Sequence, residues 1–232
     1  MPHELDGKVV VVTGGTGGIG NQIARAFAGT GAKVVIASRG LEQLEKVAAQ
    51  LRAQGHTCLA IPCDVTDAEQ VDRLMTQVIE EMGGLDVLVN CAGVALFMKP
   101  PLEISADEWR AGIAANLDNV FFCCQAAGKH MVKQQHGRII SISSVAGIKA
   151  SPAFVHYGAA KAGVINLTKS LALLWGKYNI NVNCIAPGLT ATPGVAQWLP
   201  NKIQEDGSPV PPLEYPPDPE HVADLTVFLA SD

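Results

Sequence analysis

The chain has 232 residues, 48% of them hydrophobic, which suits one domain of moderate size that buries most of its apolar surface. Its formal net charge is −5 and no Lys/Arg cluster appears, which argues against nucleic acid as a partner. No uninterrupted apolar run is long enough to cross a bilayer, so no membrane partner is expected.

The N-terminal stretch MPHELDGKVVVV does not have the pattern of a secretory signal peptide. Acidic residues precede its apolar run, and no cleavage-site pattern is present. We therefore interpret the six irregularly spaced cysteines as reduced thiols of a cytoplasmic protein. The adjacent Cys123 and Cys124 lack C-x-x-C spacing, so no metal site is predicted.

Six segments have the continuous apolar composition of strands that are buried on both faces of a sheet. They are residues 8–14, 32–38, 57–63, 85–90, 137–143 and 180–186. Helical patterns fall between them, at residues 41–51, 66–83, 105–117 and 157–175, and a last one follows at 218–232. This alternation predicts an α/β fold in which right-handed crossovers place helices on both faces of a parallel sheet.

Three of these helices carry start signals. Thr66 and Glu69 have the spacing of a capping box, as do Ser105 and Glu108. Asp218 precedes a proline and is predicted to be the N-cap of the last helix. That helix is expected to bury an apolar face made of Val222, Leu225, Phe228 and Leu229.

Residues 187–219 are rich in proline and glycine and show neither helical nor strand periodicity. Long loops in compact domains are usually functional. We predict that this segment is a substrate lid within a single catalytic domain that spans residues 1–232.

A glycine-rich turn, TGGTGGIG, follows the first predicted strand and opens a helix. Its candidate cofactor-binding residues are Gly14, Thr16, Gly18, Ile19 and Gly20. Such a turn lets the backbone approach a pyrophosphate, whose charge the helix N-terminus stabilises. A tight turn without a ligand is the alternative, but the strand before it and the helix after it favour a dinucleotide site.

The end of the second predicted strand indicates which dinucleotide is bound. An NAD-selective site needs a carboxylate there for the ribose 2′-hydroxyl, whereas this chain has Ser38 and Arg39. A guanidinium grips a 2′-phosphate with two hydrogen bonds, so NADP is the predicted cofactor. NAD is the less favoured alternative, in which Arg39 only faces solvent.

Tyr157 and Lys161 are spaced to share one face of a helix. A free phenol has a pKa of about 10, and a nearby cation lowers it by ~1–3 units. The pair therefore suits proton transfer at neutral pH, and we expect Lys161 to lower the pKa of Tyr157. Taken singly, each residue has an ordinary alternative, a packed aromatic for the tyrosine and a solvated charge for the lysine.

The chain resembles the short-chain dehydrogenases/reductases over nearly its whole length. The resemblance rests on ordered motifs: TGGTGGIG at 13–20, CDVTD at 63–67, NCAG at 90–93, NLDNVF at 116–121, SSVAG at 143–147, YGAAK at 157–161 and APG at 186–188. It implies a Rossmann-type doubly wound parallel sheet. In the family a seventh strand follows the last helix, whereas this sequence ends at Asp232. We therefore expect six strands, with residues 180–186 at an uncovered edge.

The resemblance also implies roles for the matching residues. The catalytic set would be Asn116, Ser144, Tyr157 and Lys161. The adenosine side would be bound by Asp64, Val65, Asn90, Ala92 and Gly93, with Cys91 where the family has a second asparagine. The nicotinamide side would be bound by Pro187, Gly188 and Thr192, together with Tyr157 and Lys161.

These residues predict an NADP-dependent oxidoreductase that transfers a hydride between the nicotinamide and a small-molecule carbonyl or secondary alcohol, with Tyr157 as general acid/base. The alternatives are an NAD-dependent secondary-alcohol dehydrogenase and a non-catalytic dinucleotide-binding protein. In the family, helices like 121–128 and 157–163 pair between subunits, which implies a homo-oligomer, either a dimer or a tetramer. Two interpretations stay open for Phe97, Phe154 and Trp198, namely an apolar substrate wall and core packing.

Overall fold

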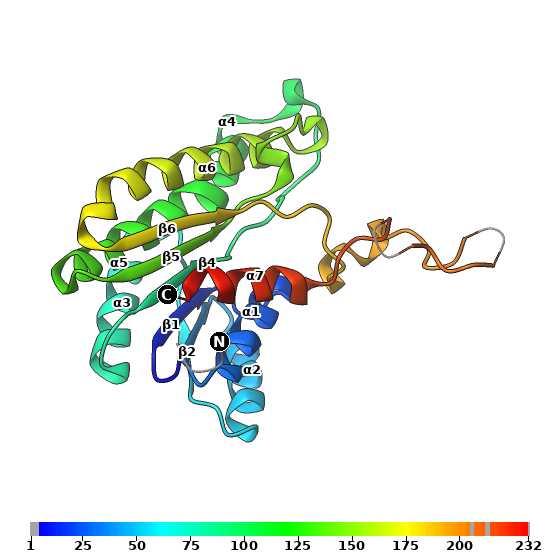
Figure 1. The fold of residues 1–232 in the computed structure, drawn as a ribbon. Helices are drawn as coiled ribbons and strands as arrows, with labels where there is room; N and C mark the ends of the chain where they lie inside the picture. The colour runs from blue at the N-terminus through cyan, green and yellow to red at the C-terminus, as the bar shows by residue number, and fades with distance from the viewer. Residues whose placement is uncertain (1–4, 205–206, 212–213, 232) are drawn as a thin grey trace.

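The computed structural model describes residues 5–204, 207–211 and 214–231, which form a parallel sheet covered by helices on both faces (Figure 1). The strands are β1 (Val9–Thr13), β2 (Lys33–Ser38), β3 (Cys58–Pro62), β4 (Val87–Asn90), β5 (Gly137–Ile142) and β6 (Ile180–Ile185). They are ordered β3-β2-β1-β4-β5-β6 and every pair is parallel. The six predicted strands are confirmed, and β6 lies at one edge of the sheet.

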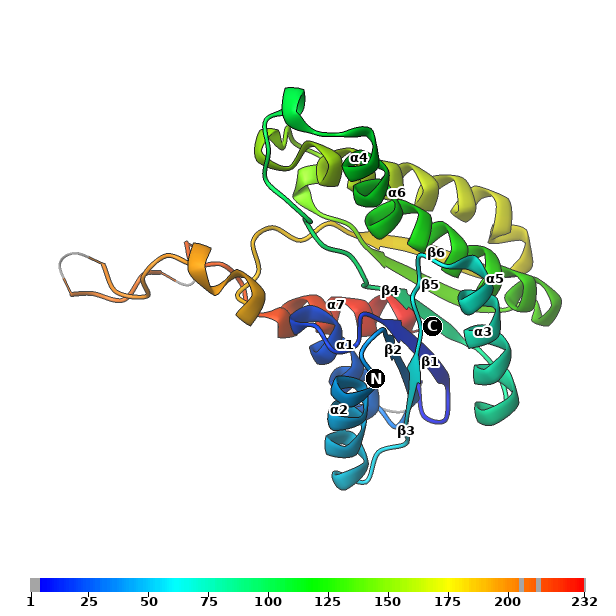
Figure 2. The same cartoon turned by 180° about the vertical axis from the view of Figure 1, so that it is seen from behind.

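The helices divide between the two faces of the sheet (Figures 1 and 2). They are α1 (Gly18–Gly29), α2 (Leu41–Ala53), α3 (Ala68–Met82), α4 (Ala106–Ile113), α5 (Asn119–Gln134), α6 (Val155–Trp175) and α7 (Pro219–Ala230). Helices α1, α2 and α7 pack on one face, whereas α3, α5 and α6 pack on the other. No helix of the described segments is long and apolar enough to cross a membrane.

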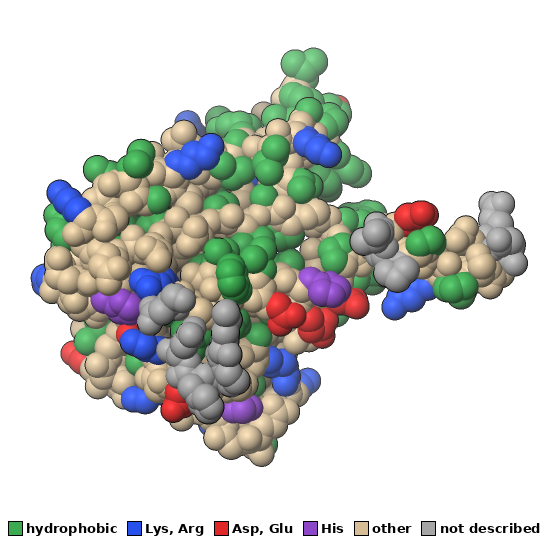
Figure 3. Space-filling view, in the orientation of Figure 1, with side chains coloured by type: hydrophobic (Ala, Val, Ile, Leu, Met, Phe, Trp, Pro, Cys, Tyr) green, Lys and Arg blue, Asp and Glu red, His purple; other side chains and the backbone are tan. Residues whose placement is uncertain are grey.

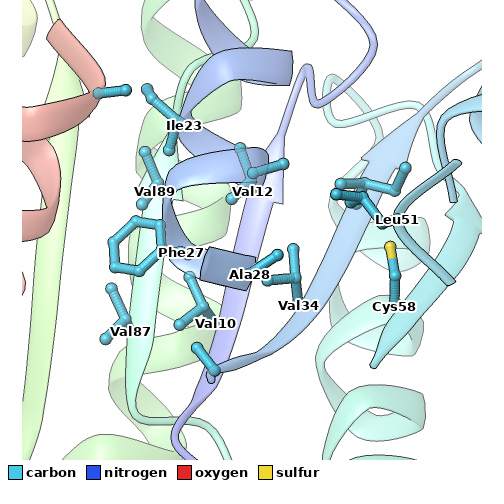
Figure 4. Close-up of a cluster of buried hydrophobic side chains, with 14 of the residues drawn as sticks. Val10, Val12, Ile23, Phe27, Ala28, Val34, Leu51, Cys58, Val87 and Val89 are labelled. Atoms are coloured by element: carbon cyan, nitrogen blue, oxygen red, sulfur yellow. The ribbon is translucent and has the colours of Figure 1, made fainter. Parts of the chain in front are cut away.

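Alternate side chains of β1 enter two separate cores, because successive residues of a strand point to opposite faces. Val10 and Val12 pack with α1, and Val9 and Val11 pack with α3 and α5. Figure 4 shows the first core, where Phe27 of α1 lies close to valines of β1 and β4. Burial on both faces explains why the strand has no polar alternation.

The chain order reverses between β1 and β4. Strands β2 and β3 lie to one side of β1, whereas β4 to β6 lie to the other. The loops that leave the carboxyl ends of β1 and β4 therefore diverge and open a crevice between them. This position is where an open α/β sheet binds its ligands.

The start signals were only partly correct. Ser105 and Glu108 form the predicted capping box of α4, with both reciprocal hydrogen bonds present. At α3 the prediction was wrong by one residue, since Asp67 is the N-cap and accepts hydrogen bonds from the backbone N–H groups of Glu69 and Gln70. Asp218 is the N-cap of α7, but its side chain makes no cap hydrogen bond.

The predicted buried face of α7 was correct for two of its four residues. Val222 is buried and Leu229 packs against the core, whereas Leu225 and Phe228 are 44% and 61% exposed. The helix also buries the smaller Ala223, Thr226 and Ala230. The face that α7 presents to the core is therefore rotated from the one that hydrophobicity alone predicts.

The segment 187–219 follows β6, and its described residues beyond Thr192 project from the body (Figure 1). It contains a 3₁₀-helix over Pro193–Trp198 and an isolated antiparallel bridge between Ile203 and Pro209. Its described residues add no strand to the main sheet. The lid role stays a prediction.

The two N-caps of α4 and α7 allow a direct test of capping. Ser105→Ala should lower the free energy of unfolding by about 1 kcal/mol, because it leaves the N–H of Glu108 without its acceptor. Asp218→Ala is the matched control and should cost less than half as much, since no cap hydrogen bond is lost. Urea unfolding of both variants measures the difference, and equal losses would contradict the assigned caps.

Candidate active site

A cavity of about 470 Å³ opens at the carboxyl ends of the central strands. Every residue predicted for the site lines it except Asn90 and Asn116. It runs from the glycine turn and Arg39 at one end to Ser144 and Tyr157 at the other. Residues from nearly the whole chain therefore meet in one crevice, at the topological reversal of the sheet.

The glycine turn is shaped by close backbone contacts. Gly14 has a φ of +68°, and a Cβ placed on it would lie 2.9 Å from the backbone of Ala92. A Cβ on Gly20 would lie 2.2 Å from the carbonyl oxygen of Gly14. Only glycine fits at both positions, and the bare backbone at the start of α1 borders the cavity. This cradle fits the pyrophosphate of a dinucleotide.

The far end of the glycine turn touches the segment that follows β6. A Cβ on Gly18 would lie 2.6 Å from Cβ of Thr192. Thr192, Pro187 and Gly188 line the same cavity as the turn. The predicted nicotinamide-side residues are thus next to the turn, although most of the chain separates them in sequence.

The end of β2 presents Arg39 to the cavity. The side chain is exposed, and no ion pair with it is formed among the described residues. Beside it, the Ser38 hydroxyl accepts a 3.4 Å hydrogen bond from Thr16 of the glycine turn. Asp64 lines the cavity opposite, and its carboxylate is held by the N–H and hydroxyl of Thr66 at 3.0 and 2.7 Å.

Two predicted residues lie behind the cavity wall. Asn90 is 2% exposed and donates hydrogen bonds to Ser141 Oγ and Cys124 Sγ, both at 3.2 Å. Asn116 is fully buried in a π-helical segment, Ala114–Asp118, that joins α4 to α5. Its amide accepts from the Val94 N–H at 2.9 Å and donates to the Val94 carbonyl at 2.8 Å. Both asparagines hold the site together from outside it.

Sequence reasoning missed Asn119, which lines the cavity. Its amide donates to the carbonyls of Ala92 and Ala115 at 3.0 and 2.9 Å. Together with Asn116 it fastens the loop after β4 to the start of α5. The NLDN sequence contains two asparagines three residues apart in a helix, where asparagine is uncommon, and this was an available signal.

Ser144, Tyr157 and Lys161 lie together at the inner end of the cavity. The Lys161 ammonium donates to the Ile142 carbonyl at 2.8 Å and lies 5.5 Å from the centre of the Tyr157 ring. Ser143 donates its hydroxyl to the Lys161 carbonyl at 2.8 Å. These bonds fix the start of α6 to the end of β5, so the helix holds both side chains at one place.

The electrostatics of the pair differ from the sequence-based expectation. Burial raises the pKa of Tyr157, and a hydrogen bond with Ser144 opposes this effect only in part. Burial also lowers the pKa of Lys161 to about 8. The expected lowering of the tyrosine pKa by Lys161 is therefore not observed, because desolvation by burial has the largest effect on this phenol and the opposing contribution comes from Ser144.

Comparisons with known proteins agree with this geometry. The model of the family described as "short chain dehydrogenase" matches residues 8–202. The chain belongs to the short-chain dehydrogenase/reductase family. It is therefore an NAD(P)-dependent oxidoreductase, which removes the non-catalytic dinucleotide-binding alternative.

Characterised family members resemble the chain along nearly its full length. It is 38% identical to the 3-oxoacyl-[acyl-carrier-protein] reductase of Synechocystis sp., over 98% of this chain and 91% of that one. It is also 38% identical to the meso-2,3-butanediol dehydrogenase of Serratia marcescens, over 98% and 89% of the two chains.

Solved structures of the family have the same fold. The crystal structure of gox2181 superposes with a TM-score of 0.90 at 31% identity, covering 98% of this chain and 90% of that one. An NAD⁺-bound xylitol dehydrogenase gives 0.89 at 29% identity, covering 99% and 94%. The doubly wound fold of the family is thus confirmed for this chain.

The buried ammonium of Lys161 predicts a pH-dependent stability. In the unfolded chain a lysine has a pKa of about 10.4. Between the folded pKa of about 8 and this value, the unfolded state keeps a proton that the folded state has released. This group's contribution to stability should therefore rise by up to about 1.4 kcal/mol per pH unit across that window.

Urea unfolding of the cofactor-free protein at pH 7.5–10 tests this, with Lys161→Met compared against the wild type. The free-energy difference, wild type minus variant, should increase as the pH rises. Lys169→Met, an exposed change on the same helix, should give a constant difference. A constant difference for Lys161→Met as well would show that its ammonium is not desolvated.

Proposed function

We propose that this chain is an NADP-dependent oxidoreductase that interconverts a small carbonyl compound and a secondary alcohol. The observation that carries the proposal is the grouping of Ser144, Tyr157 and Lys161 at one end of the cavity, with Arg39 at the other. When bound, the nicotinamide would exchange a hydride with the substrate carbon. The protein must then bind the substrate oxygen and supply or accept its proton.

Tyr157 would act as the general acid/base. Reduction builds negative charge on the substrate oxygen, and the Tyr157 hydroxyl would donate the proton that neutralises it. Burial keeps this phenol protonated, which supports its use as a donor. Ser144 would donate a second hydrogen bond to the oxygen by turning its hydroxyl proton from Tyr157 to the substrate, while its oxygen keeps accepting the Ala146 N–H at 3.1 Å.

Lys161 would stabilise the phenolate that remains after the proton has left. Its ammonium has two donor positions beyond the bond to Ile142, which suits contact with the cofactor ribose. Asn116 would act as a positioning residue, because its amide is engaged by Val94 and Gly112 and the side chain is fully buried.

NADP is proposed over NAD because of the charge at the end of β2. Arg39 and Ser38 line the cavity there, and Asp64 lies after β3 with its Oδ1 held by Thr66. A 2′-phosphate would pair with the exposed guanidinium, whereas a 2′-hydroxyl would gain little from it. NAD use is the competing proposal, supported by a related structure that is named as NAD⁺-bound.

The proposed homo-oligomer would form through α5 and α6. An apolar groove lined by Phe121, Leu171 and Trp175 runs between these helices, and Leu173 and Leu174 beside it are 87% and 61% exposed. Large exposed apolar surfaces commonly mark subunit contacts. An apolar face of this kind lowers the solubility of a monomer, which favours its burial against a second subunit.

Removing the Tyr157 hydroxyl tests the catalytic assignment. Tyr157→Phe should lower kcat by ~10²–10⁴-fold, because the proton donor is lost, while NADPH binding stays near the wild-type strength. Tyr178→Phe, at the other end of α6, is the matched control and should leave kcat unchanged. Steady-state oxidation of NADPH together with fluorescence titration measures both quantities. Retention of most turnover by Tyr157→Phe would refute the role.

Reversing the charge of Arg39 tests the cofactor assignment. Arg39→Asp should weaken NADPH by roughly tenfold or more through lost pairing and added repulsion, and should favour NADH. Arg73→Asp makes the same charge change on exposed α3, outside the cavity. Kd values for both cofactors decide the outcome. Equal losses for NADPH and NADH, or none, would leave Arg39 without a role in selectivity.

A further inference from the structure

Large apolar side chains are exposed on three loops that leave the carboxyl ends of β4, β5 and β6 and that also contribute residues to the cavity. They are Val94 and Leu96 after β4, Val145 and Ile148 after β5, and Leu189 and Trp198 after β6. Each is a large apolar residue that is 38–66% exposed. We call these six residues together with Phe154 the apolar wall.

The wall is continuous with the catalytic residues. Val94 and Leu96 line the cavity itself, next to Tyr157. Val145 follows Ser144 directly, and its N–H donates to the Pro187 carbonyl at 3.0 Å. Leu189 follows Gly188, which also lines the cavity. Val94 and Leu96 therefore border the cavity directly, and the other residues of the wall lie on the loops that lead away from it.

The projecting segment touches the body through one aromatic pair. The rings of Phe154 and Trp198 meet edge to face, with centroids 6.4 Å apart and planes at 67°. Phe154 lies three residues before Tyr157, so the pair joins the segment to the start of the catalytic helix. Hydrophobic side chains gather where this segment leaves the body (Figure 3). The Trp198 side chain stays 54% exposed, so its ring is accessible for contact with a ligand.

Charged groups are few at this end. The charged residues that line the cavity are Arg39, Asp64 and Lys161; the first two lie at the cofactor's ribose end and the third is buried. Near the wall, Lys99 is neutralised by an ion pair with Glu108. Lys149, next to Ile148, and Lys202, four residues after Trp198, are exposed but do not line the cavity. Among the described residues, an anionic substrate would therefore find no exposed cation in the cavity lining at this end.

We infer that the substrate is a neutral carbonyl compound, or the matching secondary alcohol, that carries an apolar alkyl or ring substituent. This inference rests on the function proposed above and specifies the substrate class of the same site. Ser144 and Tyr157 bind the oxygen, and the substituent lies against the apolar wall. Trp198 and Phe154 cover it, so the segment after β6 acts as an apolar lid.

The test is a series of neutral 2-ketones of increasing chain length, assayed with NADPH and with NADH. Each methylene that the wall buries should raise kcat/KM by about two- to fourfold until the wall is filled. Keto acids of the same lengths form the second series. They should be reduced more slowly, because a carboxylate placed against the wall loses hydration without gaining a partner.

Variants then assign the effect to the lid. Trp198→Ala and Phe154→Ala should flatten the dependence on chain length, so that the ratio of kcat/KM between the longest and the shortest ketone falls below that of the wild type. Ile203→Ala removes an apolar residue that is 55% exposed farther along the same segment, and it should keep the wild-type dependence. Unchanged binding of NADPH shows that each variant is folded.

The outcomes separate this inference from the proposed function. Faster turnover of the keto acids, lost in Lys149→Ala, would overturn the neutral class while leaving the oxidoreductase proposal intact. A flat response to chain length, or a wild-type response in Trp198→Ala, would overturn the lid. Absence of turnover with both series and both cofactors, in a protein that still binds a dinucleotide, would refute the carbonyl reaction and this inference with it.

Discussion

The structure depends on one close approach, between the turn after β1 and the loop after β4. The Thr13 hydroxyl accepts hydrogen bonds from the N–H groups of Cys91 and Ala92 at 3.2 and 3.3 Å. Gly14, next in the chain, must lack a side chain because the backbone of Ala92 is 2.9 Å from where its Cβ would be. The contact occurs where the order of the strands reverses, so it sets the floor of the crevice. The glycine turn, the cofactor cradle and the loop that carries Val94 all depend on it.

The asparagines of the π-helical segment secure the same loop from the other side. Asn116 engages Val94, and Asn119 engages the carbonyl of Ala92. A π-helical turn widens the helix and often occurs at functional sites. Here the wider turn lets the side-chain amides of Asn116 and Asn119 both reach the loop after β4. The loop after β4 is thus held by hydrogen bonds on both sides.

The two ends of the cavity offer opposite chemistry. At the end of β2, exposed Arg39 and the carboxylate of Asp64 suit a charged, hydrated ligand. At the end of β5, the ionisable Tyr157 and Lys161 are desolvated, and apolar side chains surround them. Desolvation shifts both pKa values toward the neutral forms of these groups. A ligand that spans the cavity therefore passes from a polar region, where charge is solvated, to a region where each charge needs a specific partner.

The sequence by itself determined the elements, because their signals are local. Continuous apolar runs located all six strands, and the glycine turn and the Tyr157–Lys161 spacing located two parts of the cavity lining. Only the tertiary structure decided features that depend on what packs against a residue. Asn90 and Asn116 lie behind the cavity wall, Leu225 and Phe228 turn away from the core, and Tyr157 has a raised rather than a lowered pKa. Side-chain volume, burial and desolvation come from neighbours distant in the chain, and periodicity carries no information about them.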